Sequence, residues 1–148
     1  MKKADAKKLA VLAPKIMNAF HDLGRQHPDN KKLSMRQFQT LIILKANERL
    51  TVTKLCDKLS LAPSTGTELV NRMIDLGFIK KSQKKDDYRH VFLSLSVEGE
   101  TLLTSREVAL TEMFLKFLEP FQPDDQERFI QSFNNIWELI AKYRKTEH

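Results

Sequence analysis

The stretch that decides the fold is VTKLCDKLSLAPSTGTELVNRMIDLG, residues 52–77. Its first half has the apolar spacing of a short helix, with one face formed by Val52, Leu55, Cys56 and Leu59. After a break at residues 60–61, Pro63 suits the first turn of a second helix, which is expected to stop at Gly77. The pattern therefore predicts two short helices joined by a tight turn, with Cys56 in a buried stripe.

The residues after this pair have the pattern of a β-hairpin. The polar turn KKDDYR at 84–89 is flanked by FIKKSQ at 78–83 and HVFLSLS at 90–96, whose apolar residues alternate with polar or surface ones. Its charges are five cations and two carboxylates: Lys80, Lys81, Lys84, Lys85 and Arg89 against Asp86 and Asp87. Such a tip is poorly suited to a core and well suited to binding phosphates.

Together these elements predict a winged helix-turn-helix within residues 52–96. In this motif the second helix of the pair enters the major groove of DNA and the hairpin reaches the backbone or the minor groove. Helical spacing turns Gly66, Leu69, Val70 and Met73 inward and leaves Ser64, Thr67, Glu68 and Asn71 outward. Asn71 can pair with adenine through two hydrogen bonds, while Glu68 either accepts from cytosine or points away from the DNA.

Longer amphipathic helices are predicted on both sides of the motif. One covers residues 5–26, a second is capped by Ser34, and a third covers 97–119. Asp124 and Asp125 can cap the last helix, whose apolar face includes Phe129, Phe133, Ile136, Ile140 and Tyr143. The fold class is thus mainly α with a small β-hairpin. The large apolar surface of the terminal helices suggests a partner.

Charge is distributed unevenly along the 148 residues, whose formal net charge is +6. Residues 1–96 hold 19 basic and 9 acidic residues, whereas residues 97–148 hold 6 basic and 10 acidic residues. The basic part would be attracted to DNA or to an anionic membrane. A solvated charged surface without a partner explains the charge equally well, so the motifs must decide.

Composition excludes several classes of protein. No apolar run approaches the roughly 20 residues of a membrane-spanning helix, so we expect a soluble, cytoplasmic protein without a membrane partner. The single cysteine, Cys56, allows neither an internal disulfide nor a cysteine-based zinc site. No nucleophile with a base, carboxylate pair or phosphate-binding glycine loop is visible, so neither enzymatic activity nor a metal or other cofactor is expected.

In combination the motifs resemble the MarR family of bacterial transcription regulators over nearly the whole chain. LSMRQFQTLIIL at 33–44 is similar to the family's second helix, and LCDKLSLAPSTGTELVNRMIDLGFIKK at 55–81 to its helix-turn-helix and following strand. DDYRHVFLSLSVEG at 86–99 resembles its wing, with the Asp-x-Arg signature at Asp87 and Arg89.

The resemblance implies two regions with different roles. Residues 1–33 and 97–148 would form a helical dimerisation region, and residues 34–96 the DNA-binding region, with the recognition helix at about 63–77 and the wing at about 78–96. A homodimer would meet two half-sites of an inverted repeat in double-stranded DNA. Family members are commonly repressors released by small aromatic or phenolic effectors.

The predicted DNA-binding residues lie on the recognition helix and the wing: Pro63, Ser64, Thr65, Thr67, Glu68, Asn71, Arg72, Lys84, Lys85, Asp87 and Arg89. An effector pocket is predicted from residues of the first two helices: Met17, Phe20, His21, Met35 and Phe38. For its apolar members an ordinary core position is at least as good an explanation. His21 borders the cleft between the two regions or is simply solvated.

Three residues depart from the family pattern. Ala62 stands where the family often has a serine cap, and Glu68 where it often has arginine. Gly66 replaces the usual β-branched residue although glycine is unfavourable in a helix, and we interpret it as a sign of close helix packing. Cys56 lies outside the first helix, where oxidant-sensing relatives carry their cysteine, so a packing role is favoured over a redox role.

Two other functions stay open from sequence. A winged-helix module can serve protein assembly instead of DNA binding, because fold does not fix function. A DNA-binding regulator can also act without any ligand. The first alternative predicts little salt-sensitive DNA binding.

Overall fold

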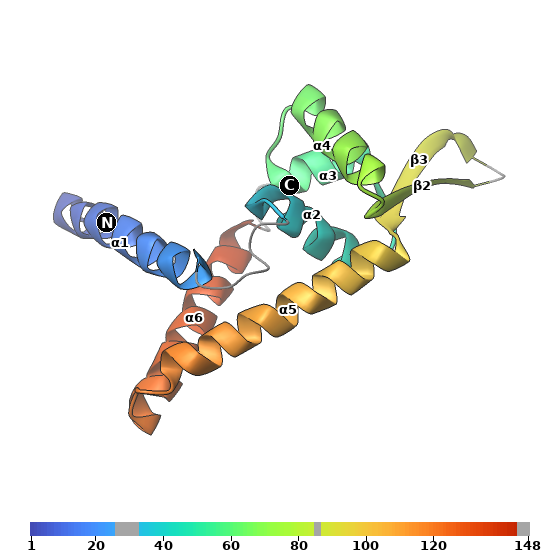
Figure 1. The fold of residues 1–148 in the computed structure, drawn as a ribbon. Helices are drawn as coiled ribbons and strands as arrows, with labels where there is room; N and C mark the ends of the chain where they lie inside the picture. Colours follow the sequence, from blue (N-terminus) through green and yellow to red (C-terminus); the bar gives the residue numbers. More distant parts are fainter. Residues whose placement is uncertain (26–32, 85–86, 145–148) are drawn as a thin grey trace. The chain divides into compact units, whose positions relative to one another are not determined.

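The computed structural model describes residues 1–25, 33–84 and 87–144 (Figure 1). The chain forms two compact units, residues 1–111 and residues 112–148. Its elements, in chain order, are α1 (Lys3–Arg25), α2 (Met35–Ala46), β1 (Leu50–Thr51), α3 (Val52–Leu59), α4 (Pro63–Asp75), β2 (Ile79–Lys84), β3 (Asp87–Leu95), α5 (Val97–Leu118) and α6 (Pro123–Arg144).

The helix starts follow from local chemistry. Ser34 caps α2 with a capping box, in which its Oγ accepts from the Gln37 amide at 3.2 Å and the Gln37 Oε1 accepts from the Ser34 amide at 2.9 Å. The predicted cap is therefore confirmed. Helix α4 has Ala62 at its cap position, which offers no side-chain hydrogen bond, and Pro63 at its first helical position.

The turn between α3 and α4 is tight, as predicted. Ser60 adopts a left-handed conformation with φ 53° and ψ 48°, which ends α3. The Leu61 amide then donates to the Cys56 carbonyl at 3.0 Å and the Ser60 amide to the Asp57 carbonyl at 3.2 Å, so these two carbonyls of α3 are satisfied within the turn.

A small antiparallel sheet with strand order β1-β3-β2 carries the wing. Strand β1 was not predicted, because two residues carry no alternation and become a strand only by pairing with β3, Leu50 opposite Leu93. The predicted turn at 84–89 was too long. After a register shift that follows Gln83, Lys84 still pairs with Asp87, since main-chain hydrogen bonds do not require apolar side chains.

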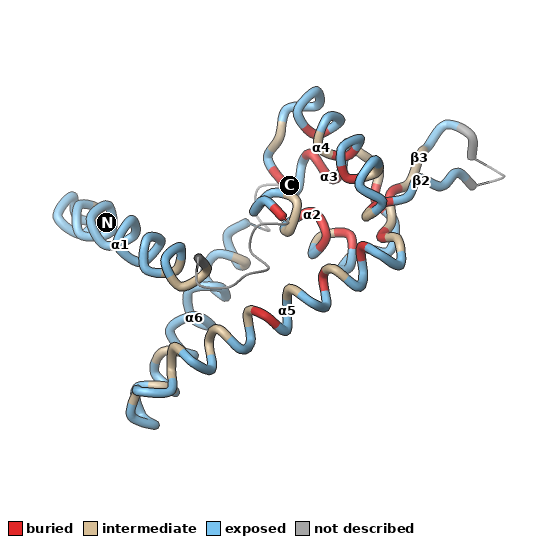
Figure 2. Tube along the Cα trace, in the orientation of Figure 1, coloured by how far each residue is buried: buried red, intermediate tan, exposed pale blue. Residues whose placement is uncertain are grey.

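The core of the first unit lies among α2, α3, α4 and the sheet (Figure 2). Its most completely buried apolar side chains are Leu41, Leu55, Val70, Met73 and Leu93. Each of the helices α2, α3 and α4 therefore turns one face inward, and α4 is left with a polar outer face.

The second unit is built on aromatic rings. Phe117, Phe121 and Phe129 lie with ring centroids 5.2 to 6.1 Å apart, a spacing typical of stabilising aromatic pairs. The Gln126 side chain donates to the Leu118 carbonyl at 3.0 Å and so covers the end of α5. Helix α6 begins at Pro123, so Asp124 and the next aspartate lie inside its first turn, not at its cap as expected.

Large apolar side chains are exposed on α6 and on α1. On α6 no described residue is buried, and the exposed set is Ile130, Phe133, Ile136, Trp137, Leu139, Ile140 and Tyr143. On α1 the exposed set is Leu9, Val11, Leu12, Ile16 and Met17. None of the helices in the described ranges is long and apolar enough to cross a membrane.

Candidate nucleic-acid interface

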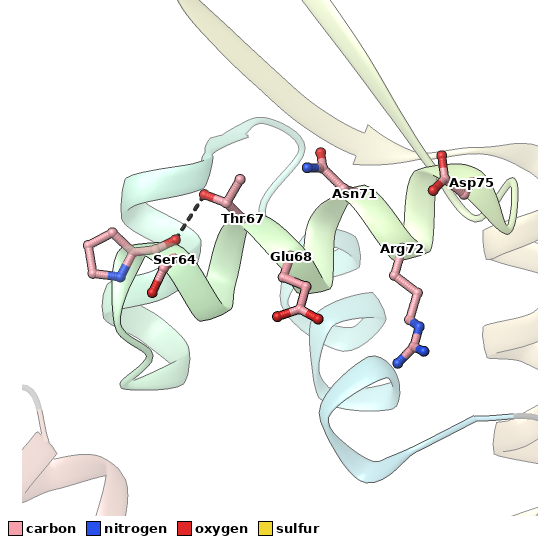
Figure 3. A pocket seen from close by; sticks show the side chains of 7 residues that line it. Ser64, Thr67, Glu68, Asn71, Arg72 and Asp75 are labelled. Atoms are coloured by element: carbon pink, nitrogen blue, oxygen red, sulfur yellow. Dashed lines mark hydrogen bonds between the residues drawn. The ribbon is translucent and has the colours of Figure 1, made fainter.

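The outer face of α4 forms an open hollow of about 750 Å³ (Figure 3). Its lining residues are Pro63, Ser64, Thr67, Glu68, Asn71, Arg72 and Asp75. Gly66, Val70 and Met73 are buried on the opposite side of the same helix. The inward and outward faces predicted from helical spacing are thus confirmed.

The lining side chains project from α4 in two rows (Figure 3). Glu68 and Arg72 point to one side of the helix, and Thr67 and Asn71 to the other. Residues four apart share a row because the α-helix repeats every 3.6 residues. The Thr67 hydroxyl donates to the Pro63 carbonyl at 2.8 Å, so toward a ligand it can act as an acceptor.

The charge of this face is not simply basic. Arg72 is its only cation among the lining residues, beside the carboxylates of Glu68 and Asp75. Sequence reasoning missed Asp75, although it follows Asn71 by four residues and therefore shares its row. Outside α4, Lys80 and Lys81 of β2 are exposed.

The other predicted DNA-binding residues do not line this hollow. Thr65 is exposed on α4 but does not line the hollow. Arg89 is exposed on β3. Lys84 and Asp87 end the paired strands, and their side chains, like all of Lys85, lie outside the described residues.

Hydrogen bonds fix the end of α3 and the segment that follows α4. The Arg36 guanidinium on α2 donates to the Leu59 carbonyl at 2.8 Å, which fixes the end of α3. Beyond α4, the Ser96 hydroxyl donates to the Gly77 carbonyl at 2.5 Å and accepts from the Gly99 amide at 3.0 Å. Gly99 has no room for a Cβ, which would lie 2.1 Å from the Phe78 carbonyl oxygen. This junction ties α5 to the end of α4 and the start of the wing.

The predicted effector residues come from two helices. On α1, Met17 and His21 are exposed and Phe20 is half-buried. On α2, Met35 is exposed, whereas Phe38 is half-buried and packs against the core. Within the described residues no group of three potential metal ligands occurs.

Arg106 on α5 lies beside one of these residues. Its guanidinium carbon is 5.6 Å from the centroid of the Phe38 ring, within the range of a cation–π contact. Its Nε is buried without a hydrogen-bond partner among the described residues. Sequence reasoning missed Arg106, because no local pattern brings residue 106 to residue 38.

Parts of this chain are similar in sequence to known proteins. Residues 33–91 match the model of the MarR family. The organic hydroperoxide resistance transcriptional regulator of Bacillus subtilis is 32% identical over 74 residues, half of this chain and half of that protein.

Two solved structures are similar over almost the whole chain. A MarR family protein from Bacillus stearothermophilus has a TM-score of 0.79 and 24% identity, covering 95% of this chain and 99% of that one. A mutant of MarR from E. coli, complexed with operator DNA, has a TM-score of 0.66 and 14% identity, covering 89% and 95%.

Proposed function

We propose that this chain, whose residues 33–91 match the model of the MarR family, is a DNA-binding transcription regulator that acts as a homodimeric repressor, binds an inverted-repeat operator and is released by a small effector. The observation that carries the proposal is α4. One face of this helix is buried in the core, and the other presents Ser64, Thr67, Glu68 and Asn71 to solvent.

We assign the reading of bases to the middle of α4. Asn71 offers the donor and acceptor that pair with adenine in the major groove, and Glu68 offers an acceptor for the cytosine amino group. Lys80, Lys81 and Arg89 supply positive charge for the phosphates, which carry affinity but no sequence information.

Dimerisation is supported by the apolar side chains that one chain leaves uncovered on α6. Trp137 is 64% exposed and Ile136 is 56% exposed, which is costly for side chains of this size in water. A symmetric dimer would place two copies of α4 on successive grooves of one DNA face.

An effector site is supported by the contact between α2 and α5. Arg106 and Phe38 offer a guanidinium and an aromatic ring side by side, which suits an aromatic carboxylate or a phenol. Such a ligand would release DNA by favouring a dimer whose recognition helices no longer match the groove spacing. Met17, Phe20, His21 and Met35 are the further residues that we assign to this site.

The roles of Asn71 and Arg89 can be separated by mutation. Asn71→Ala should cost about 1–3 kcal/mol on a selected duplex and little on random DNA, with an altered base preference. Arg89→Ala should weaken binding to both duplexes and reduce the salt slope by about 1. Asn134→Ala on the exposed face of α6 is the matched control. Equal losses on both duplexes for both variants would contradict the assignment.

The effector role can be tested with benzoate as the probe. Benzoate should reduce operator affinity of the wild-type protein, and Arg106→Gln should require much more benzoate for the same release, because it removes the guanidinium. Lys116→Gln, on the exposed surface of the same helix, is the control. Release that is unchanged in Arg106→Gln would refute this site.

A further inference from the structure

The Cys56 thiol lies at the contact between α3 and α4. A Cβ built on Gly66 of α4 would lie 2.1 Å from the Sγ of Cys56 on α3 and 3.5 Å from its Cβ. Non-bonded heavy atoms do not approach to 2.1 Å, so the thiol occupies the space that any larger residue at position 66 would need.

The backbone does not explain the glycine. The residues with positive φ in the described ranges are Ser60 and Gly77, and Gly66 lies in the second turn of a regular helix. Glycine at this place costs up to about 1 kcal/mol relative to alanine. Its presence is therefore accounted for by the thiol and not by chain conformation.

The thiol is well enclosed. Cys56 is 5% exposed; Leu55 beside it in α3 and Val70, one turn after Gly66 in α4, are each 1% exposed. Because protein interiors are closely packed, we expect the gain or loss of one atom at Cys56 or Gly66 to shift α4. Ser64, Thr67 and Glu68, immediately around Gly66, are exposed in the interface hollow.

We propose that Cys56 is a positioning residue for DNA recognition: its thiol, seated against Gly66, sets the distance between α3 and the first half of α4. This inference rests on the proposed function, because the depth at which Ser64, Thr67 and Glu68 enter the groove depends on that distance. Cys56 touches no DNA and acts only through α4.

The geometry predicts that an atom removed from the side chain at position 56 can be replaced by an atom added at position 66. Gly66→Ala alone places a methyl group and a thiol in one space, so either the thiol rotates away or α4 moves; because the surrounding core is closely packed, we expect α4 to move. Cys56→Ala alone leaves a void of about one sulfur atom. In the double variant Cys56→Ala/Gly66→Ala, the methyl group at position 66 takes the place of the thiol, and the two Cβ atoms lie at an ordinary contact distance of 3.5 Å.

The experiment compares the wild type with these three variants. For each protein, the dissociation constant is measured on a selected operator duplex and on a random duplex at one salt concentration, together with the thermal midpoint. Gly66→Ala should lose about tenfold or more of its operator affinity, the equivalent of one base contact, and little of its affinity for random DNA. The double variant should recover operator affinity to within about threefold of the wild type, and its thermal midpoint should recover as well, helped by the better helix propensity of alanine.

Two further measurements separate positioning from stability. Leu44→Ala on α2, where the side chain is 2% exposed, should lower the thermal midpoint without changing the ratio of operator to random affinity. A small methylating disulfide reagent should modify Cys56 several-fold faster in Gly66→Ala than in the wild type, because the displaced helix uncovers the thiol.

The proposal fails if Gly66→Ala keeps the operator affinity and thermal midpoint of the wild type, or if the double variant does not recover. If Gly66→Ala does not fold, the double variant decides: a folded double variant with wild-type operator affinity supports the proposal, and an unfolded one refutes it. If the wild type binds the selected and the random duplex equally well, the proposed function fails instead. The thermal midpoints of the four proteins and the reactivity of Cys56 then still test the contact between Cys56 and Gly66.

Discussion

Ser96→Ala should loosen the junction between the wing and α5. The Ser96 hydroxyl accepts from the Gly99 amide at 3.0 Å in the manner of a helix N-cap, and it donates to the Gly77 carbonyl. Loss of an N-cap costs about 1 kcal/mol, and loss of a second, solvent-accessible hydrogen bond about 0.5–1.5 kcal/mol. The free energy of unfolding should therefore fall by about 2 kcal/mol.

The thermal midpoint, measured at fixed protein concentration, reports this loss. For a chain of this size 2 kcal/mol corresponds to a decrease of about 4–8 °C. Ser105→Ala, which changes an exposed serine within the same helix, is the control and should leave the midpoint unchanged or slightly raised. A decrease of less than about 1 °C for Ser96→Ala, or an equal decrease for the control, would refute the reasoning.

Three further predictions concern the turn, the core and the dimer. Gly77 has φ +81° with no atom within 4 Å of a built Cβ, so Gly77→Ala should cost about 1–2 kcal/mol through backbone strain alone, and Gly77→Asn less, as measured by urea unfolding. An equal cost for both would contradict this. Met73 is 0% exposed, and Met73→Ala should cost about 2–5 kcal/mol with an unchanged denaturant slope; a cost below about 1 kcal/mol would show that the core is not packed as described. Ile136→Lys should convert the dimer to a monomer in light scattering, whereas Asn134→Lys should not; a dimer that survives Ile136→Lys would exclude this face of α6 from the interface.

Local chemistry made much of the fold predictable. The Ser34 cap, Pro63 at the start of α4 and the stop at Gly77 each act within a few residues, so the sequence contains their signal. The inward and outward faces of α4 follow from helical spacing. Even the close packing at Gly66 was predictable, because glycine within a helix needs a reason, and the structure identifies the Cys56 thiol as that reason.

Contacts between distant residues were not predictable. Strand β1 exists only through its pairing with β3, and two residues cannot show a period. The position of Arg106 over the Phe38 ring joins residues of two helices that are far apart in the chain. Asp75 was missed for another reason: it is the last residue of α4, one turn beyond the polar residues that mark the outer face in the sequence.

The most direct test of the account is selection of bound duplexes from a random library at moderate salt, using protein whose mass has been determined by light scattering. We expect a dimer that enriches an inverted repeat whose half-sites lie about one helical turn apart, with binding that weakens as salt increases. A dimer that enriches no sequence, or binding that vanishes at modest salt without sequence preference, would contradict the assignment of α4 to base recognition.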